Sequence, residues 1–463
     1  MRYGRIFNSV HGFIRIVIQI AIVGLAAALA QQAMAQQNAR SQLSAQEKAR
    51  LSKQLPLMMR RMTNLMATGK YDAAIKISKD VIAGLERLGL KGSPIYFTGL
   101  AGLAQLYAFK RNFARAEDIQ REVLEARRRQ HGENHPSVAE SLTALSDIHF
   151  ALEKLDLAER ELQQALAIRQ ATLPPSDPNF GITFIKLGRM AHHRSRMDEA
   201  YRHLKAALDL FEKHLPADHP YMPLALNNLA EIHKELAQYD QAEDMLKRAL
   251  AINKRVHKDK PLLYAPNLNN LAGLYRLRGD YVKAEAHQRE ELEITERAFG
   301  PKHPSLAKTL NNLALILDDQ GKPRAAIALF RRALTIVQQA KPVDQRLIAT
   351  TMNNLANSLS AVEEYRESEH LFTRAFNIRE EVLGGDDPLV ALTLSNLAAL
   401  YQQQELYDKA LPLTRRALRI HQRALPADHP KLALSFNNLG IILDQTGKSS
   451  QAREMHEKAL SIR

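Results

Sequence analysis

Apolar residues recur at spacings of three and four along most of the chain, in pairs of stretches separated by a short polar break. In one pair, the first stretch carries Leu306, Leu310, Leu313, Ala314 and Leu317, and the second carries Ala326, Leu329, Phe330, Ala333, Leu334 and Ile336. This spacing places apolar side chains along one face of a helix. The break contains Gly321, which accepts the left-handed backbone conformation at a helix end. The pattern therefore predicts two amphipathic helices joined as a hairpin.

The hairpin is repeated along the chain. The motif Asn-Asn-Leu-Ala, or a close variant of it, begins at positions 227, 269, 311, 353, 395 and 437, so successive copies lie 42 residues apart. A second marker with the same period occurs at Tyr71, Phe113, Leu155, Met197, Tyr239, Tyr281, Pro323, Tyr365, Tyr407 and Ser449. A constant period without insertions indicates one structural unit stacked on itself. We predict ten repeats over residues 55–463, of which the first is degenerate.

Two further columns of the repeat carry structural information. One is small throughout: Ala74, Ala116, Ala158, Ala200, Ala242, Ala284, Ala326, Ser368, Ala410 and Ala452. Two helices approach to about 8 Å only where the contact residues are small, so this column predicts a helix crossing. The other is the linker between repeats: His135-Pro136, Asp177-Pro178, His219-Pro220, His303-Pro304, Asp387-Pro388 and His429-Pro430. Asp caps a helix well and His less well, and Pro suits the first helical position, so we expect first helices to begin at these prolines. The linkers at Lys260-Pro261 and Lys341-Pro342 depart from the motif.

A segment of a different kind precedes the repeats. Arg2, Arg5 and Arg15 come before an apolar run from Ile16 to Ala30, and Ala33-Met34-Ala35 then supplies small residues around the expected cleavage point. This layout is typical of a secretory signal peptide, so we predict a signal peptide over residues 1–35, cleavage after Ala35, and a periplasmic or secreted protein. A helix of this run reaches only about 23 Å, short of the roughly 30 Å hydrocarbon core. An uncleaved membrane anchor stays open as the alternative. The absence of Cys is compatible with export.

Residues 36–54 are polar and form a predicted lead-in helix. Ser44 and Glu47 have the spacing of a capping box, which indicates where this helix starts. Pro56 is expected to kink or restart it, because proline lacks the N–H that a helix interior needs.

The chain is basic, with a formal net charge of +14, and removing Arg2, Arg5 and Arg15 leaves +11. Such a balance favours acidic partners or an anionic surface. The cations are mixed with 50 acidic residues, and aromatic residues make up only 6% of the chain, so we expect no nucleic-acid partner. Basic pairs at Lys247-Arg248, Arg331-Arg332 and Arg415-Arg416 recur at one place in the repeat and are interpreted as a solvated outer helix face.

Catalytic and cofactor motifs are not evident. The chain has no Gly-x-Ser-x-Gly turn and no Cys nucleophile, so no catalytic residue is proposed. Thr446-Gly447-Lys448-Ser449 imitates the end of a phosphate-binding loop, but Ile442 stands where that loop requires glycine. His131, His135 and the pair His192-His193 lack further convergent donors, so we predict no metal site and no cofactor.

The repeat length, the Asn-Asn-Leu-Ala motif and the His-Pro linker together resemble the kinesin light chain type of tetratricopeptide repeat, from about Leu55 to Arg463. The resemblance is weaker in the first repeats, where residues 99–104 lack the Asn pair. It implies an all-α, right-handed superhelical solenoid that holds partner peptides in its concave groove. Attachment to a motor is not implied, because only about twenty residues separate the predicted cleavage point from the repeats and no long heptad segment fits there.

The resemblance also implies which residues face the groove, namely the Asn pairs Asn227, Asn228, Asn269, Asn270, Asn311, Asn312, Asn353, Asn354, Asn437 and Asn438, together with Asn396. An Asn amide offers two donors and one acceptor oxygen, which suits the backbone of an extended peptide. Alternatively, an Asn only orders the stack, and we expect one member of each pair in each role. One turn further along, the residues run from charged (Asp147, Arg189, Glu231) to apolar (Leu315, Ala399, Ile441) through Gly273 and Asn357.

Cationic positions on the predicted groove indicate the chemistry of the partner. We predict that Arg189, Lys234 and Arg276 anchor an acidic protein or a C-terminal carboxylate. The sequence thus predicts a non-enzymatic scaffold that binds a protein or an extended peptide. Two alternatives remain open: the interaction subunit of an enzyme system whose catalytic domain lies on another chain, and a membrane-anchored cytoplasmic adaptor.

Overall fold

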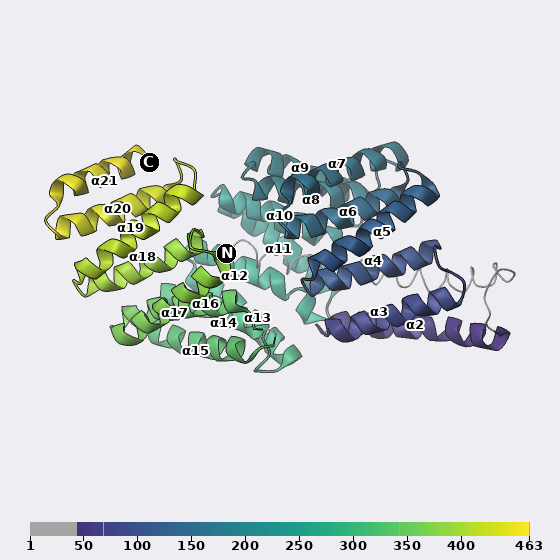
Figure 1. Cartoon of the computed structure of the whole chain (residues 1–463), viewed down its shortest axis with the longest axis horizontal. Coiled ribbons are helices and arrows are strands. Elements are labelled where there is room, and N and C mark those ends of the chain that lie inside the picture. Colours follow the sequence, from purple (N-terminus) through teal and green to yellow (C-terminus); the bar gives the residue numbers. More distant parts are fainter. Residues whose placement is uncertain (1–43, 68, 342, 463) are drawn as a thin grey trace. The chain divides into compact units, whose positions relative to one another are not determined.

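The computed structural model describes residues 44–463 except 68, 342 and 463, and the predicted signal peptide lies outside the described residues. Over this range the chain forms twenty α-helices, one 3₁₀ helix and no strand, which confirms the predicted all-α class (Figure 1). The helices are α2 (Ala45–Ala67), α3 (Tyr71–Arg87), α4 (Pro94–Phe109), α5 (Phe113–His131), α6 (Pro136–Ala151), α7 (Leu155–Thr172), α8 (Pro178–His193), α9 (Met197–His214), α10 (Tyr221–Glu235), α11 (Tyr239–Val256), η1 (Pro261–Leu263), α12 (Ala265–Leu277), α13 (Tyr281–Phe299), α14 (Leu306–Asp319), α15 (Pro323–Gln339), α16 (Gln345–Ala361), α17 (Tyr365–Leu383), α18 (Pro388–Gln403), α19 (Tyr407–Ala424), α20 (Pro430–Gln445) and α21 (Ser449–Ser461).

Even-numbered helices are the first helices of hairpins and odd-numbered helices are the second. Every second helix, from α3 at Tyr71 to α21 at Ser449, begins at the residue that the second sequence marker occupies. The predicted repeat register is therefore correct over the described chain. Within residues 44–463, no helix combines the length and the apolar character that a membrane span requires.

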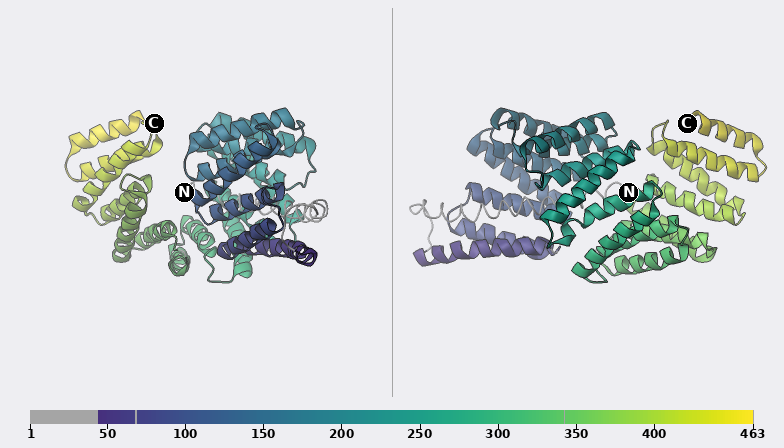
Figure 2. Two further views of the ribbon diagram at one scale, coloured as in Figure 1. Left: turned by 45° about the vertical axis from the view of Figure 1, so that its right-hand side comes forward. Right: turned by 180° about the vertical axis from the view of Figure 1, so that it is seen from behind.

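The chain divides into two compact units within α12. Unit 1 extends to Asn267 and unit 2 runs from Leu268 to the end of the chain. Each unit has its own buried core, built from the facing sides of first and second helices, such as Leu204, Phe211 and Leu226 in unit 1 and Phe330, Met352 and Phe372 in unit 2. Figure 2 shows the stacked helix pairs of each unit from two further directions.

The small-residue column lies at helix crossings, as predicted. All ten of its residues, from Ala74 to Ala452, have an exposed fraction of 0%. At the single serine, the Ser368 hydroxyl donates a hydrogen bond to the Ala356 carbonyl oxygen at 2.7 Å, which shows how closely the second helix of that repeat approaches the first. A larger side chain at this column would have to displace a neighbouring backbone.

The linkers cap the first helices through their His or Asp side chains. Asp177 and Asp387 accept a hydrogen bond from the backbone N–H two residues later at 2.8 and 2.7 Å. The Nδ1 atoms of His135, His219, His303 and His429 do the same at 3.1 to 3.2 Å. Asp is thus the closer cap, as its stronger acceptor predicts.

Two expected helix starts differ in the structure. α14 begins at Leu306 and not at Pro304, and α10 begins at Tyr221 and not at Pro220. Before α14, the N–H groups of Leu306 and Ala307 bond to carbonyl oxygens three residues back, so the first turn is tighter than an α-helical turn.

The N-terminal helix also departs from the prediction. The Ser44 and Glu47 capping box is present, because the Glu47 N–H donates to Ser44 Oγ at 3.3 Å and the Ser44 N–H donates to Glu47 Oε2 at 3.0 Å. However, α2 continues through Pro56, so the helix does not restart there. Leu55 and Met59, on either side of the proline, are buried in the same core cluster, and this packing stabilises one continuous helix.

The turn between the two helices of a hairpin has one residue in the left-handed region in every repeat. Gly69, Gly279, Gly321 and Gly447 occupy this position in four repeats. In the other six it is Arg111, Glu153, Ser195, Ala237, Glu363 or Glu405, with φ between 57° and 63°. Each of these six residues holds a conformation that a Cβ atom disfavours.

Candidate functional site

The Asn pairs of unit 2 bond to each other from repeat to repeat. Asn312 Nδ2 donates to Asn269 Oδ1 at 2.7 Å, Asn354 to Asn311 at 3.0 Å, and Asn396 to Asn353 at 3.2 Å. In each case the second Asn of one repeat donates to the first Asn of the repeat before it. This series, called the Asn ladder below, joins the first helices α12, α14, α16 and α18.

The Asn residues of unit 1 and of the last repeat bond differently. Asn227 and Asn228 donate to the carbonyl oxygens of Pro223 and Leu224, one turn back on α10, at 2.6 and 2.7 Å. Asn227 also accepts a hydrogen bond from Asn267 at 3.2 Å. Near the C-terminus, Asn437 Oδ1 lies 3.1 Å from His456 Nδ1 of the same hairpin.

These contacts give the Asn pairs a role in ordering the stack. In the ladder the first Asn of a pair accepts a hydrogen bond from the next repeat, and the second Asn donates one to the repeat before. Both members therefore contact neighbouring repeats, and neither is left solely for a partner peptide. Asn311, Asn353 and Asn354 are only 7%, 3% and 7% exposed. Each Asn of the ladder still has hydrogen-bonding capacity that its ladder contact does not use, because an amide has two donors and one acceptor oxygen. Peptide binding by these amides stays a prediction.

The three predicted cationic anchors have different surroundings. Lys234 Nζ forms an ion pair with Glu231 on its own helix. Arg276 Nε forms an ion pair with Asp319 of the next repeat. Arg189 has neither a hydrogen bond nor an ion pair with any described residue, and its guanidinium lies over the Phe150 ring, 5.8 Å from the centroid. Burial lowers the pKa of Arg189, and the charge of Asp147 opposes this effect.

A cation that sequence reasoning did not select lies beside Arg189. Lys186 occupies the position of the second Asn, 42 residues before Asn228, and its Nζ forms an ion pair with Asp147 Oδ1 at 2.5 Å. Its side chain is only 15% exposed, and burial lowers its pKa. This column reads Gly102, Ala144 and Lys186 before Asn228, and a cation at the column of the second Asn was the available signal. Lys186 and Arg189 thus form a cationic pair on α8 that faces one carboxylate, Asp147.

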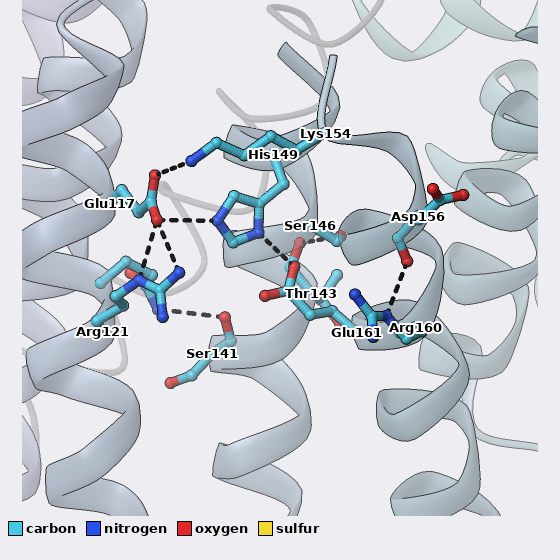
Figure 3. Close-up of polar contacts among 11 residues, drawn as sticks. Glu117, Arg121, Ser141, Thr143, Ser146, His149, Lys154, Asp156, Arg160 and Glu161 are labelled. Atoms are coloured by element: carbon cyan, nitrogen blue, oxygen red, sulfur yellow. Dashed lines mark hydrogen bonds and ion pairs between the residues drawn. The ribbon is translucent and has the colours of Figure 1, made fainter. Parts of the chain in front are cut away.

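A buried ionic network surrounds His149 on α6 (Figure 3). Asp147 lies on the same helix. His149 is fully buried, with Nδ1 2.7 Å from Glu161 Oε2 on α7 and Nε2 3.2 Å from Glu117 Oε1 on α5. Burial alone would lower the pKa of His149, but the two carboxylates outweigh it and raise this pKa. Burial raises the pKa of Glu117, yet hydrogen bonds from Arg121, Lys154 and His149 bring it to about 2. The network joins three successive helices through one imidazole.

In unit 2 the exposed face of the first helices is apolar in its last two repeats. Leu392 on α18 is 40% exposed, and Leu434 and Ile441 on α20 are 57% and 42% exposed. Ala399 is also exposed. In the series for which we predicted a change from charged to apolar, Asp147, Asn357, Ala399 and Ile441 are exposed, whereas Arg189, Glu231, Gly273 and Leu315 are half-buried. A binding groove that changes character along its length stays a prediction.

We expected the basic pairs on the second helices to form a solvated face, but one member of each pair is engaged in an ion pair. The second member of each pair forms an ion pair with a glutamate of the preceding second helix: Arg248 with Glu212, Arg332 with Glu296, and Arg416 with Glu380. These side chains link neighbouring repeats on the outer face. In the described part of the chain, no three His, Cys, Asp or Glu side chains are grouped as metal ligands would be.

Comparison with known proteins identifies the family. The Tetratricopeptide repeat family model matches residues 100–171, 180–255, 264–339, 347–422 and 389–463. Because these matches cover more than half of the chain, the protein belongs to the tetratricopeptide repeat family. A comparison with curated proteins found no match.

Several solved structures are similar to this chain. The quorum sensor NprR from B. thuringiensis is 14% identical, with a TM-score of 0.55 over 79% of this chain and 98% of that chain. The STAND protein PH0952 from Pyrococcus horikoshii, which has a tetratricopeptide repeat sensor, is 16% identical, with a TM-score of 0.53 over 79% of this chain and 52% of that chain. BtubC (BKLC) from P. vanneervenii is 24% identical, with a TM-score of 0.43 over 49% of this chain and 91% of that chain. At these identities the similarity concerns the fold.

Proposed function

We propose that this protein is a non-enzymatic scaffold of the kinesin light chain type, which binds an acidic protein or an extended peptide along the exposed face of its first helices. The proposal is based mainly on one observation: Arg189 has neither a hydrogen bond nor an ion pair with any described residue. The guanidinium of Arg189 is half-buried and has no acceptor among the described residues, and a carboxylate of a partner would supply two parallel hydrogen bonds. Lys186 lies beside it and pairs with Asp147, which alone faces the two cations, so a second carboxylate is electrostatically favourable at this place.

The rest of the first-helix face supports binding of an extended chain. Within unit 2, the half-buried ladder residues Asn269, Asn312 and Asn396 keep amide groups that match the donors and acceptors of a peptide backbone, whereas Asn311, Asn353 and Asn354 are buried. Lys234 and Arg276 already have carboxylate partners, so they are weaker candidates for the anchor than Arg189. We therefore place the main anionic contact at α8.

A peptide-display selection on the full-length protein tests this proposal. Enriched peptides should carry Asp, Glu or a free C-terminal carboxylate, and Arg189→Gln should weaken their binding about tenfold or more, as expected for a charge-assisted contact. Arg374→Gln is the matched control. Arg374 is exposed on the second helix α17, and its substitution removes the same charge as Arg189→Gln. Enrichment of uncharged peptides, or an equal effect of the two variants, would contradict the proposal.

We also propose that the protein is exported. The basic residues, the apolar run Ile16–Ala30 and the small residues up to Ala35 support cleavage after Ala35. The mass of the mature chain tests this: a chain beginning at Gln36 is expected, whereas an intact Met1 in the membrane fraction would favour an anchored protein.

A further inference from the structure

The first described helix, α2, has one packed face and one free face. Figure 1 shows α2 beside α3. Leu55 and Met59 of α2 are 1% and 5% exposed and pack in the core cluster shared with α3. At 3.6 residues per turn, positions 50, 53, 60 and 61 all lie within about 60° of Leu57 on the opposite side. Leu57 is 65% exposed, and the four residues around it are the exposed cations Arg50, Lys53, Arg60 and Arg61. This set of five residues is called the basic face of α2.

No carboxylate neutralises the basic face. None of its four cations has a hydrogen bond or an ion pair with another residue of the described chain. The single acid of α2, Glu47, bonds to the backbone N–H and hydroxyl of Ser44 at the start of the helix. On α3, Asp72 bonds to Lys110, and Glu86 accepts a hydrogen bond from Tyr96. Many cations elsewhere pair with a neighbouring repeat, so this concentration of unpaired positive charge distinguishes α2.

We propose that the basic face of α2 docks on an anionic lipid surface, with its cations among the headgroup phosphates and Leu57 in the interfacial layer. A helix with cations around an exposed apolar side chain has the features of an interfacial membrane helix. In the sequence, α2 follows the apolar run Ile16–Ala30 by a short stretch of chain, so the protein is expected to reach a membrane during its targeting.

A nucleic acid fits this face less well. Single-stranded nucleic acid is bound by stacking on aromatic side chains, and α2 contains no aromatic residue. The exposed Leu57 lies in the centre of the cations, where it would separate a phosphate backbone from part of them. In a bilayer interface the same side chain contributes favourably, because it leaves water.

The expected effect follows from the number of cations. Each Lys or Arg near an anionic membrane surface increases binding about fivefold. Neutralising four of them should therefore raise the half-saturating lipid concentration several hundredfold. The binding should also weaken with added salt, because salt screens exposed charges.

The chain contains no Cys, so a single engineered Cys can be labelled without interference. We would attach an environment-sensitive fluorophore at Gln54→Cys, an exposed position of α2, in the full-length chain. Its emission would be followed with vesicles of phosphatidylcholine alone and with vesicles containing phosphatidylglycerol. The local label reports on α2 whether or not the apolar run inserts elsewhere in the bilayer.

Two variants with equal net charge distinguish binding through the basic face of α2 from a general electrostatic attraction between the basic protein and the vesicle. The test variant is Arg50→Gln/Lys53→Gln/Arg60→Gln/Arg61→Gln. The control is Arg324→Gln/Arg366→Gln/Arg374→Gln/Arg419→Gln, which removes four exposed cations of unit 2 that form no ion pair within the described chain. Far-UV circular dichroism verifies the helix content of both. A third variant, Leu57→Ser, keeps the charges and should weaken binding about tenfold.

The proposal predicts a blue shift only with phosphatidylglycerol vesicles, a loss of several hundredfold in the test variant, and a change below about threefold in the control. Three results would overturn it: an equal shift with phosphatidylcholine alone, an equal loss in the test and control variants, or binding of a single-stranded oligonucleotide that is tighter than vesicle binding and depends on the same four cations.

Discussion

The hydrogen bond between Asn354 and Asn311 gives a direct test of the Asn ladder. Asn354 Nδ2 donates to Asn311 Oδ1 at 3.0 Å, and both residues are 7% exposed. Replacing Asn354 by Ala leaves the Asn311 oxygen without this donor, which costs about 1–3 kcal/mol for a buried polar group. The higher helix propensity of Ala returns about 0.5 kcal/mol. The net loss of unfolding free energy should be about 0.5–2.5 kcal/mol.

A double-mutant cycle isolates the interaction itself. Asn311→Ala should cost a similar amount, because it leaves the Asn354 amide without its acceptor. The double variant should be less destabilised than the sum of the two single variants, by about 1–2 kcal/mol, because it leaves neither group unpaired. Equilibrium urea unfolding measures the free energies, and hydrogen exchange of α16 amides gives a local reading.

Asn357→Ala is the matched control. Asn357 is exposed on the same helix and has no hydrogen bond within the described chain, so its replacement should be neutral or stabilising by about 0.5 kcal/mol. If the two ladder substitutions add within about 0.3 kcal/mol, they are independent and the ladder does not stabilise the stack.

Three further substitutions test other features. Because the pKa of His149 is raised, its protonated form contributes stability that is fully present below pH 6.5, the ordinary pKa, and is lost as pH rises through the raised pKa. Urea unfolding midpoints measured against pH should show this decline. His149→Gln should make the midpoints less dependent on pH. Ala237→Gly should stabilise unit 1 by about 0.5–1 kcal/mol, because glycine removes the Cβ strain at φ 57°, and a lower melting temperature would refute this. Ala326→Leu should destabilise unit 2 by about 1–3 kcal/mol in urea unfolding, because Ala326 is fully buried at a helix crossing, and an unchanged midpoint would show that the crossing has space.

The features that sequence reasoning predicted well depend on local chemistry. The second helices begin where the marker residues predict, and the linker His and Asp side chains cap the first helices, because a turn and a cap involve residues only a few positions apart. The buried column from Ala74 to Ala452 was also predictable, because every helix crossing imposes the same limit on size.

The features that were missed depend on how neighbouring helices are offset. Asn312 bonds to Asn269 across 43 residues, and no local signal specifies that pairing. Lys234 and Arg276 form ion pairs with carboxylates and Arg189 forms none within the described chain, although all three are cations on first helices. The continuity of α2 through Pro56 also depends on packing, here against α3.

The central claim, that the exposed face of the first helices binds the partner, is tested most directly by site-specific crosslinking. Because the chain contains no Cys, a benzophenone can be placed singly at Asp147→Cys on the first helix α6, at the position that Arg189 occupies one repeat later, or at Arg202→Cys on the second helix α9, and both residues are exposed. With a display-selected peptide bound, we expect adducts from Asp147→Cys that unlabelled peptide suppresses, and none from Arg202→Cys. Adducts only from Arg202→Cys would place the partner on the second helices and contradict the account.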